Sequence, residues 1–353
     1  MKQRRESDNT SSVTIHEVAK HAGVSSMTVS RVINKNVPVR EKLRTKVLES
    51  IKALNYIPNI AARSTRSGDS GIRIGILYSH PSASYLNEIM LGGLEQASKL
   101  GTQVLLEKCG GLQSQKTAVS RLVEAGVDGV ILPPPLCDSA PTVQMLTREG
   151  IPVLALATAR PLPMVSAVRI DDFEGALALT RHLTKLGHKR IGFIKGDPSH
   201  TPTEVRYEGF LQGLDEADLP LLDDLVVQGM FTYKSGLEAG RKLLDREDRP
   251  TAIFASNDDM AAGVMAVAHG MGIHIPEQLS ICGFDDTPVA STIWPQLTTV
   301  HQPIVAMGKS AIATIVEKIK EARTSGQMGK PKRQLMKFTL MDRESTGPAP
   351  HRD

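Results

Sequence analysis

The fold of the N-terminal segment is decided by residues 13–34, which consist of VTIHEVAKHAGVSSMTVSRVIN. Thr14 is a favourable N-cap, and Glu17 three residues later completes a capping-box pattern for a short first helix. Gly23 accepts a positive φ, which predicts a tight turn, and Ser25 can cap a second helix. The spacing predicts a helix-turn-helix within three short helices over residues 13–56.

The second helix of this pattern has one apolar and one polar face. Val29, Val32 and Ile33 face inward. The outer face carries Ser26, Met27, Ser30, Arg31 and Asn34. Short hydrogen-bonding side chains and an arginine, at the start of a helix whose positive end points outward, are what a reader of the DNA major groove needs.

Charge is spread unevenly along the chain of 353 residues. Residues 1–66 hold 13 Lys and Arg against 5 Asp and Glu, whereas the remainder holds 29 against 33. A basic head on a mildly acidic body predicts an anionic partner for the head.

The sequence carries no readable targeting, membrane or metal-binding motif. The three cysteines are far apart, which indicates a reducing compartment and no disulfide scaffold. An apolar export segment and a membrane-spanning run are both absent, so we expect a cytoplasmic, nucleoid-associated protein. His16 and His21 resemble part of a zinc-protease signature, but five residues place them about 140° apart on a helix. We therefore expect no metal and no cofactor.

After residue 70, strand-type and helix-type patterns alternate. Two series of strands are predicted: 72–78, 103–108, 127–132 and 152–157, then 190–195, 225–228, 252–255 and 279–284. Helices are expected between them, and a late helix over 305–322 should pack back on the first series. Repeated β-α units with continuous apolar strands predict an α/β body of two similar subdomains, each with a parallel sheet covered on both faces.

The same residues carry a family resemblance. Residues 13–34, NYIPN at 55–59, AARS at 61–64, HLTKLGHKRIGFI at 182–194, and the stretches 256–259, 283–286 and 297–300 resemble the lactose-repressor (LacI/GalR) family. The resemblance covers almost the whole chain. It implies an all-α helix-turn-helix head and a periplasmic-binding-protein-like body. It also implies a transcriptional regulator, a repressor, whose affinity for operator DNA is switched by a small effector.

The residue patterns and this resemblance together predict four regions. They are a disordered tail (1–12), the helix-turn-helix domain (13–58), a hinge helix with linker (59–70) and a ligand-binding domain (71–345). The N-subdomain is expected at about 71–165 and 300–335, and the C-subdomain at about 166–299. One helix-turn-helix covers a half-site, so a homodimer on a near-palindromic operator is expected. The tail MDRESTGPAPHRD lacks the leucine heptad that makes some relatives tetramers.

The resemblance also assigns DNA contacts. Base edges would be read by Ser26, Met27 and Arg31. Phosphates would be bound by Thr14, Thr28, Ser30, Asn34 and Asn59. The hinge would place Ala62, Arg63 and Thr65 in the minor groove. Thr65 stands where the family usually has a leucine wedge, which favours a weaker operator kink over an altered operator centre or a compensating contact from Arg63 or Arg66.

Effector contacts are implied at Tyr85, Leu86, Arg206, Phe231, Asn257 and Asp285. An arginine, an asparagine, an aspartate and one aromatic plate suit a polyhydroxylated ring such as a sugar. Asn257 could instead be a plain helix N-cap. Ala157 stands where relatives often carry an aspartate, and Arg160 could substitute for it and favour an acidic sugar.

Three other functions compete with this one. An enzyme is disfavoured because no phosphate-binding loop, nucleophile elbow or metal cluster is readable. A transport binding protein would need an export signal, and the basic head contradicts it. A regulator that answers to a nucleobase or to a phosphoprotein partner stays open.

Overall fold

The computed structural model describes residues 15–26, 28, 29, 32, 40–54, 71–79, 83–326 and 329–350. They belong to two compact units, Met1–Gly71 and Ile72–Asp353. Each unit has its own apolar core.

The N-terminal unit is helical. Helix α1 (Ile15–Ala22) packs against α3 (Glu41–Ala53), and residues 26, 28, 29 and 32 between them are also helical. Their apolar side chains share one small core, made of Val18, Ala19, Ala22, Val29, Val32 and Val47. The prediction of three helices over residues 13–56 is confirmed for the part of this segment that is described.

The turn after α1 has the predicted geometry. Gly23 has a φ of +65°, and the backbone N–H of Val24 donates to the carbonyl of Ala19 over 3.0 Å. Ser25 Oγ accepts the N–H of Thr28 over 3.2 Å, which is the expected cap of the second helix. His21 donates to or accepts from Ser50 Oγ on α3 over 3.0 Å, so its imidazole joins two helices.

The second unit begins with a six-stranded parallel sheet in the order β11-β5-β4-β3-β1-β2. Its strands are β1 (Arg73–Tyr78), β2 (Gln103–Lys108), β3 (Gly129–Leu132), β4 (Val153–Leu156), β5 (Ser166–Arg169) and β11 (Arg333–Leu335). The first four confirm the predicted first series. β5 and β11 were not predicted, because β11 is exposed throughout and β5 has a polar residue at each end, so neither forms an apolar run.

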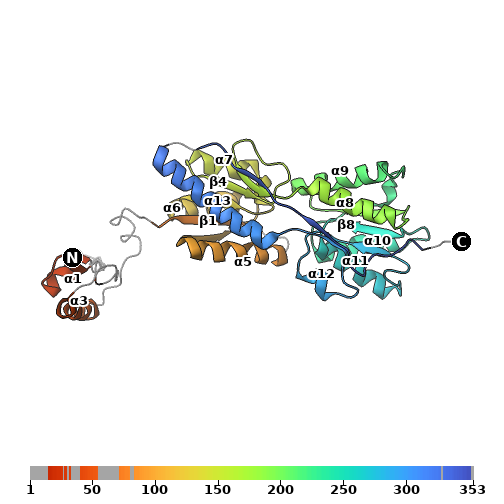
Figure 1. Cartoon of the computed structure of the whole chain (residues 1–353). Coiled ribbons are helices and arrows are strands. Elements are labelled where there is room, and N and C mark those ends of the chain that lie inside the picture. The colour runs from red at the N-terminus through yellow and green to blue at the C-terminus, as the bar shows by residue number, and fades with distance from the viewer. Residues whose placement is uncertain are drawn as a thin grey trace, which may run out of the picture. The chain divides into compact units, whose positions relative to one another are not determined.

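Helices cover both faces of this sheet. On β3, Val130 packs with side chains of α6 (Leu112–Glu124) and α7 (Ala140–Arg148), whereas the next residue, Ile131, packs with α5 (Ala83–Leu100) and α13 (Ile304–Ser325). Figure 1 shows α13 lying along α5, as the sequence predicted. A Cβ on Gly92 of α5 would lie 1.9 Å from the carbonyl oxygen of Val305, so this close helix contact requires glycine.

A four-stranded parallel sheet, in the order β7-β6-β8-β9, forms the other half of the body. Its strands are β6 (Ile191–Lys195), β7 (Val226–Gln228), β8 (Ala252–Ala255) and β9 (Ser280–Cys282). One face packs on α8 (Asp172–Lys185) and α9 (Thr201–Asp215), the other on α10 (Tyr233–Leu244) and α11 (Asp258–Gly270). Short elements η1 (Leu136–Asp138), η2 (Asp223–Leu225) and α12 (Pro288–Thr292) complete the two halves. The predicted α/β class and the second series are confirmed.

The chain passes between the halves in two places that the expected subdomain boundaries do not reproduce. β5 begins at residue 166, where the C-subdomain was expected to start, but it pairs with β4 in the first sheet. Strand β10 (Thr299–His301) pairs with β12 (Thr339–Met341), and the following residues pack on the second sheet, where Ser345 accepts from the N–H of Ile281. Within the described residues, no helix has the length and apolarity that crossing a membrane requires.

Candidate functional site

A cavity lies where the two halves of the body face each other. All six residues that the sequence assigned to an effector line it: Tyr85, Leu86, Arg206, Phe231, Asn257 and Asp285. Further lining comes from Ser79, Ile89, Pro133, Pro134, Ala157, His200 and Pro202. Many of these residues follow the carboxyl ends of the parallel strands, which is where open α/β sheets bind ligands.

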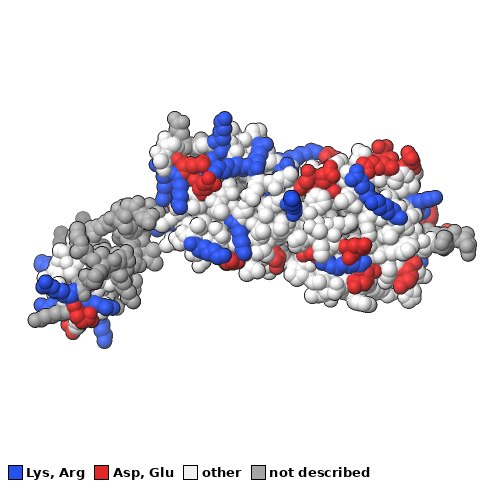
Figure 2. All heavy atoms as spheres, viewed as in Figure 1, with Lys and Arg blue, Asp and Glu red and all other residues white. Residues whose placement is uncertain are grey.

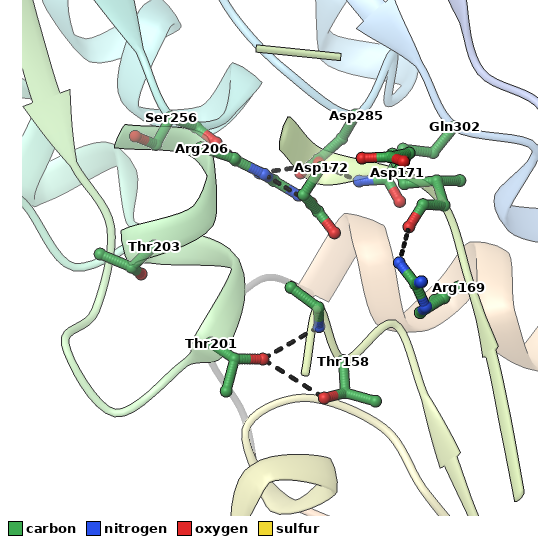
Figure 3. A network of polar contacts seen from close by, with 12 residues as sticks. Thr158, Arg169, Asp171, Asp172, Thr201, Thr203, Arg206, Ser256, Asp285 and Gln302 are labelled. Atoms are coloured by element: carbon green, nitrogen blue, oxygen red, sulfur yellow. Dashed lines mark hydrogen bonds and ion pairs between the residues drawn. The ribbon is translucent and has the colours of Figure 1, made fainter. Parts of the chain in front are cut away.

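Arg206 is the centre of a buried charge cluster. Its Nε donates to Asp172 Oδ1 over 2.9 Å, and its Nη1 donates to the carbonyl of Ser256 over 2.5 Å (Figure 3). The same Nη1 lies 3.4 Å from Asp285 Oδ1. Its guanidinium also lies 3.7 Å from the ring centroid of Phe284. Burial by itself lowers the pKa of Arg206, but the two carboxylates outweigh burial and raise it.

Asp285 joins this cluster to the first half of the body. Its Oδ1 accepts from Gln302 Nε2 over 2.7 Å, and Gln302 Oε1 accepts from the hydroxyl of Tyr85 over 3.3 Å. Burial raises the pKa of Asp285 to about 7, although Arg206 opposes the shift. Its φ of 112° is a strained backbone conformation of the kind found at ligand sites. Gln302 was not predicted, because nothing near it in the sequence connects it with Asp285.

Asn257 is a helix N-cap, as the alternative prediction had it, and it also shapes the cavity. Its Oδ1 accepts the N–H of Met260 over 3.0 Å, which caps α11. Its Nδ2 donates to the carbonyl of Phe231 over 3.1 Å, and Phe231 has a φ of 56°. The Phe231 ring rests on Gly196, where an added Cβ would lie 2.0 Å from ring carbon Cζ. The amide thus holds the aromatic plate against the cavity wall.

His200 is a lining residue that the sequence reasoning missed. It is the N-cap residue of α9, is 4% exposed, and stacks on Phe231 with 5.3 Å between ring centroids. Burial lowers its pKa below the usual value. The signal that could have found it was its place in GDPSHTPTEV, the stretch that leaves β6 and opens the helix of Arg206.

Arg160 does not take the role suggested for it. Ala157 lines the cavity, but Arg160 Nη2 lies 2.5 Å from Glu208 Oε1, and its side chain is 57% exposed. An exposed ion pair satisfies this guanidinium outside the cavity lining. The suggestion that Arg160 replaces a missing carboxylate and favours an acidic sugar is therefore wrong in this structure.

A second polar group ties the two halves together beside the cavity. Asp138, at the end of η1 in the first half, accepts from the backbone N–H of Thr201 over 2.9 Å, and Thr201 begins α9 in the second half. The hydroxyls of Thr158 and Thr201 donate to Asp138 Oδ1 over 2.6 and 2.9 Å. Figure 3 shows the two threonines facing each other below Arg206.

In the N-terminal unit, two predicted DNA contacts fall on described residues. Ser26 and Thr28 are both half-buried, and Thr28 Oγ1 lies 3.0 Å from Ser25 Oγ. Figure 2 shows Lys and Arg side chains on the surface of this unit. The other predicted contacts lie outside the described residues: Thr14, Met27, Ser30, Arg31, Asn34, Asn59, Ala62, Arg63 and Thr65.

Comparison with known proteins decides the family. Residues 14–59 match the model of bacterial regulatory proteins of the lacI family, and residues 180–346 match a periplasmic binding protein-like domain. The chain is 36% identical over 343 residues to the HTH-type transcriptional regulator DegA of Bacillus subtilis, covering 95% of this chain and 98% of DegA. The chain belongs to the LacI family. As a LacI-family protein it is a DNA-binding transcriptional regulator and not an enzyme.

Solved LacI-family structures agree with this assignment. A complex of the transcriptional regulator CelR with cellobiose matches at a TM-score of 0.71 and 32% identity, covering 94% of this chain and 99% of that one. The Lac repressor dimer bound to operator and the anti-inducer ONPF matches at a TM-score of 0.81 and 28% identity, covering 96% and 100%.

Proposed function

We propose that this LacI-family regulator represses transcription as a homodimer on a near-palindromic operator, and that a sugar or sugar derivative switches its operator affinity from the cavity of the body. The observation that carries the proposal is the cavity itself. The residues that line it come from both halves of the body and lie far apart in the sequence, as Tyr85 and Asp285 do.

The cavity chemistry favours a polyhydroxylated ring. Phe231 offers an aromatic face, while Arg206 and Asp285 offer charged hydrogen-bonding groups close together. Apolar walls with a few fixed polar groups are typical of small-molecule sites. Cellobiose in the CelR complex is consistent with a ligand of this class.

The same cavity gives a route from ligand to DNA. A ligand that touches Leu86 in one half and Arg206 in the other stabilises one relative arrangement of the halves over another. Operator affinity then changes by the coupling free energy between the two sites. We assign base contacts to Ser26, Met27 and Arg31, and hinge contacts to Ala62, Arg63 and Thr65.

The test begins with selection of bound DNA from a random pool by the full chain. Fluorescence anisotropy with the selected DNA then measures affinity alone and with cellobiose, ribose, galactose, galacturonate or hypoxanthine. We expect a symmetric site and a saccharide that changes its affinity. A response to hypoxanthine alone would instead support a nucleobase-controlled regulator.

Two variants make the DNA assay specific. Arg31→Ala should lower the affinity for the selected DNA by about 10- to 100-fold, because a lost bidentate base contact costs about 1–3 kcal/mol. Its affinity for random DNA should change little. The control is Arg241→Ala, which removes an exposed cation on α10 of the other unit. Equal weakening by both variants would contradict a base-reading role for Arg31.

A further inference from the structure

One side chain in the cavity has hydrogen-bonding capacity that the described protein does not use. His200 is buried and lines the cavity, yet its Nε2 has no hydrogen-bond partner among the described residues. The carboxylate oxygen Asp197 Oδ2 lies 4.0 Å away, beyond hydrogen-bonding reach.

Each neighbouring polar group already has at least one partner within the protein. Arg206 uses Nε and Nη1, Asn257 uses both amide atoms, and Asp285 accepts from Gln302. Burying a polar atom without a partner costs free energy, and a phenyl ring would fill the same space without that cost. Packing and folding therefore do not explain an imidazole at this position.

The geometry instead suits a ligand. The imidazole and the Phe231 ring form a two-ring aromatic wall, inclined by 24° to each other. The outer χ angle of a histidine is soft, so a small ring rotation turns the unpaired nitrogen edge toward a bound molecule without moving the backbone of α9.

Charge in and around the cavity argues for an uncharged ligand. Arg206 is countered by Asp172 and Asp285, and Arg160 pairs with Glu208 elsewhere. Burial lowers the pKa of His200, which keeps its imidazole neutral near pH 7. An anionic ligand would meet no uncompensated cation on the described lining residues.

We propose that His200 is a specificity-determining residue that selects an uncharged, hydroxylated ring by a hydrogen bond from its imidazole. This inference rests on the proposed role of the cavity as the effector site. His200 then makes the hydrogen bond to a ligand hydroxyl that Ala157, with its methyl side chain, cannot make.

The first arm of the test needs no ligand. Thermal unfolding of the full chain is compared for wild type, His200→Phe and a matched control, His188→Phe. His188 is also buried, but its ring nitrogens lie 3.0 Å from Thr251 Oγ1, Ser280 Oγ and the carbonyl of Gly347. We expect His188→Phe to lower the Tm by several degrees, because it leaves these partners unpaired, and His200→Phe to leave the Tm unchanged or higher. A drop in His200→Phe as large as in the control would overturn the proposal, because the protein itself would then use His200.

The second arm measures binding by calorimetry, with cellobiose, galactose, galacturonate and hypoxanthine as probes. A neutral saccharide should bind wild type, bind His200→Phe roughly tenfold more weakly, and regain affinity in His200→Gln, since one hydrogen bond is lost and then replaced. Unchanged affinity in His200→Phe, or a preference for galacturonate over galactose, overturns the inference.

Failure of the proposed function and failure of the role of His200 would give different results. If no saccharide binds wild type, the carbohydrate part of the proposed function fails, and with it the hydroxylated ring assigned to His200. If hypoxanthine binds and His200→Phe weakens it, the role of His200 stands and only the carbohydrate is wrong.

Discussion

Asp138 in one half of the body accepts a hydrogen bond from the backbone N–H of Thr201 in the other, with 2.9 Å between the two atoms. A carboxylate from the other half of the body therefore holds the N-terminus of α9, whose N–H groups and helix dipole favour negative charge. Thr158 and the hydroxyl of Thr201 donate to the same carboxylate.

Replacing Asp138 by alanine should lower the free energy of unfolding by about 1–3 kcal/mol, because donors at the interface lose their acceptor. Urea denaturation of the ligand-free chain measures this. Asp138→Asn keeps one acceptor oxygen and should lose less. Equal stability of Asp138→Ala and wild type would show that the two halves do not depend on this contact.

Arg206→Met should be strongly destabilising. It leaves Asp172 and Asp285 buried without their cation, and breaking a buried ion pair from one side costs about 3–5 kcal/mol. The control is Arg181→Met, which removes an exposed arginine paired with Glu216 and should barely move the urea midpoint. Similar losses in the two variants would argue against a special role for burial.

Gly196→Ala should weaken effector binding without unfolding the chain. The new Cβ would lie 2.0 Å from the Phe231 ring, so the ring must leave the cavity wall. We expect the saccharide that binds wild type to bind at least about tenfold more weakly, measured by calorimetry. In Gly192→Ala, within β6 just before Gly196, the added Cβ meets its nearest atoms at 3.4 Å, so binding should persist. Unaltered binding in Gly196→Ala would remove Phe231 from the site.

Asp285 should give the body a distinct pH dependence. Its pKa in the folded chain is raised to about 7, so between about pH 4 and pH 7 the folded chain holds a proton that the unfolded chain has released. Stability from this group is therefore lost as pH rises through about 7. Relative to Asp285→Asn, wild type should lose free energy of unfolding between pH 5 and pH 8, as followed by urea denaturation. A constant difference across this range would refute the shift.

Thr65→Leu should increase the bend of operator DNA, because leucine supplies the larger wedge that the family usually inserts. Such wedges kink the duplex by about 20–90°. Circular-permutation gels with the selected operator measure the bend angle. If wild type already bends DNA as strongly as Thr65→Leu, the expectation of a weaker kink is wrong.

Sequence reasoning worked best where a local pattern has one physical reading. The Gly23 turn with the Ser25 cap is fixed by a few neighbouring residues, and the structure confirms it. The buried strands, such as Gly129–Leu132, appear as apolar runs because both of their faces are covered. Arg206 and Asp285 were assigned to the effector by the family resemblance, and the structure places both on one cavity.

The short edge strands were not predicted, because no local sequence pattern marks them. β11 is exposed throughout and contains three residues, so it shows no alternation of apolar and polar side chains. β12 is equally short, and its pairing with β10 joins residues about forty positions apart.

The sequence by itself therefore determined the helix-turn-helix, the two β-α series and, through the family resemblance, the candidate effector residues. Tertiary structure alone decided which groups are engaged and which are unpaired. Tyr85 and Gln302 form a hydrogen bond although 217 positions separate them in the sequence. Asp138 accepts a hydrogen bond from Thr201 of the other half, and Arg160 forms an ion pair with Glu208. Hydrogen bonds and desolvation act over a few ångströms in space, and only the folded chain sets those distances.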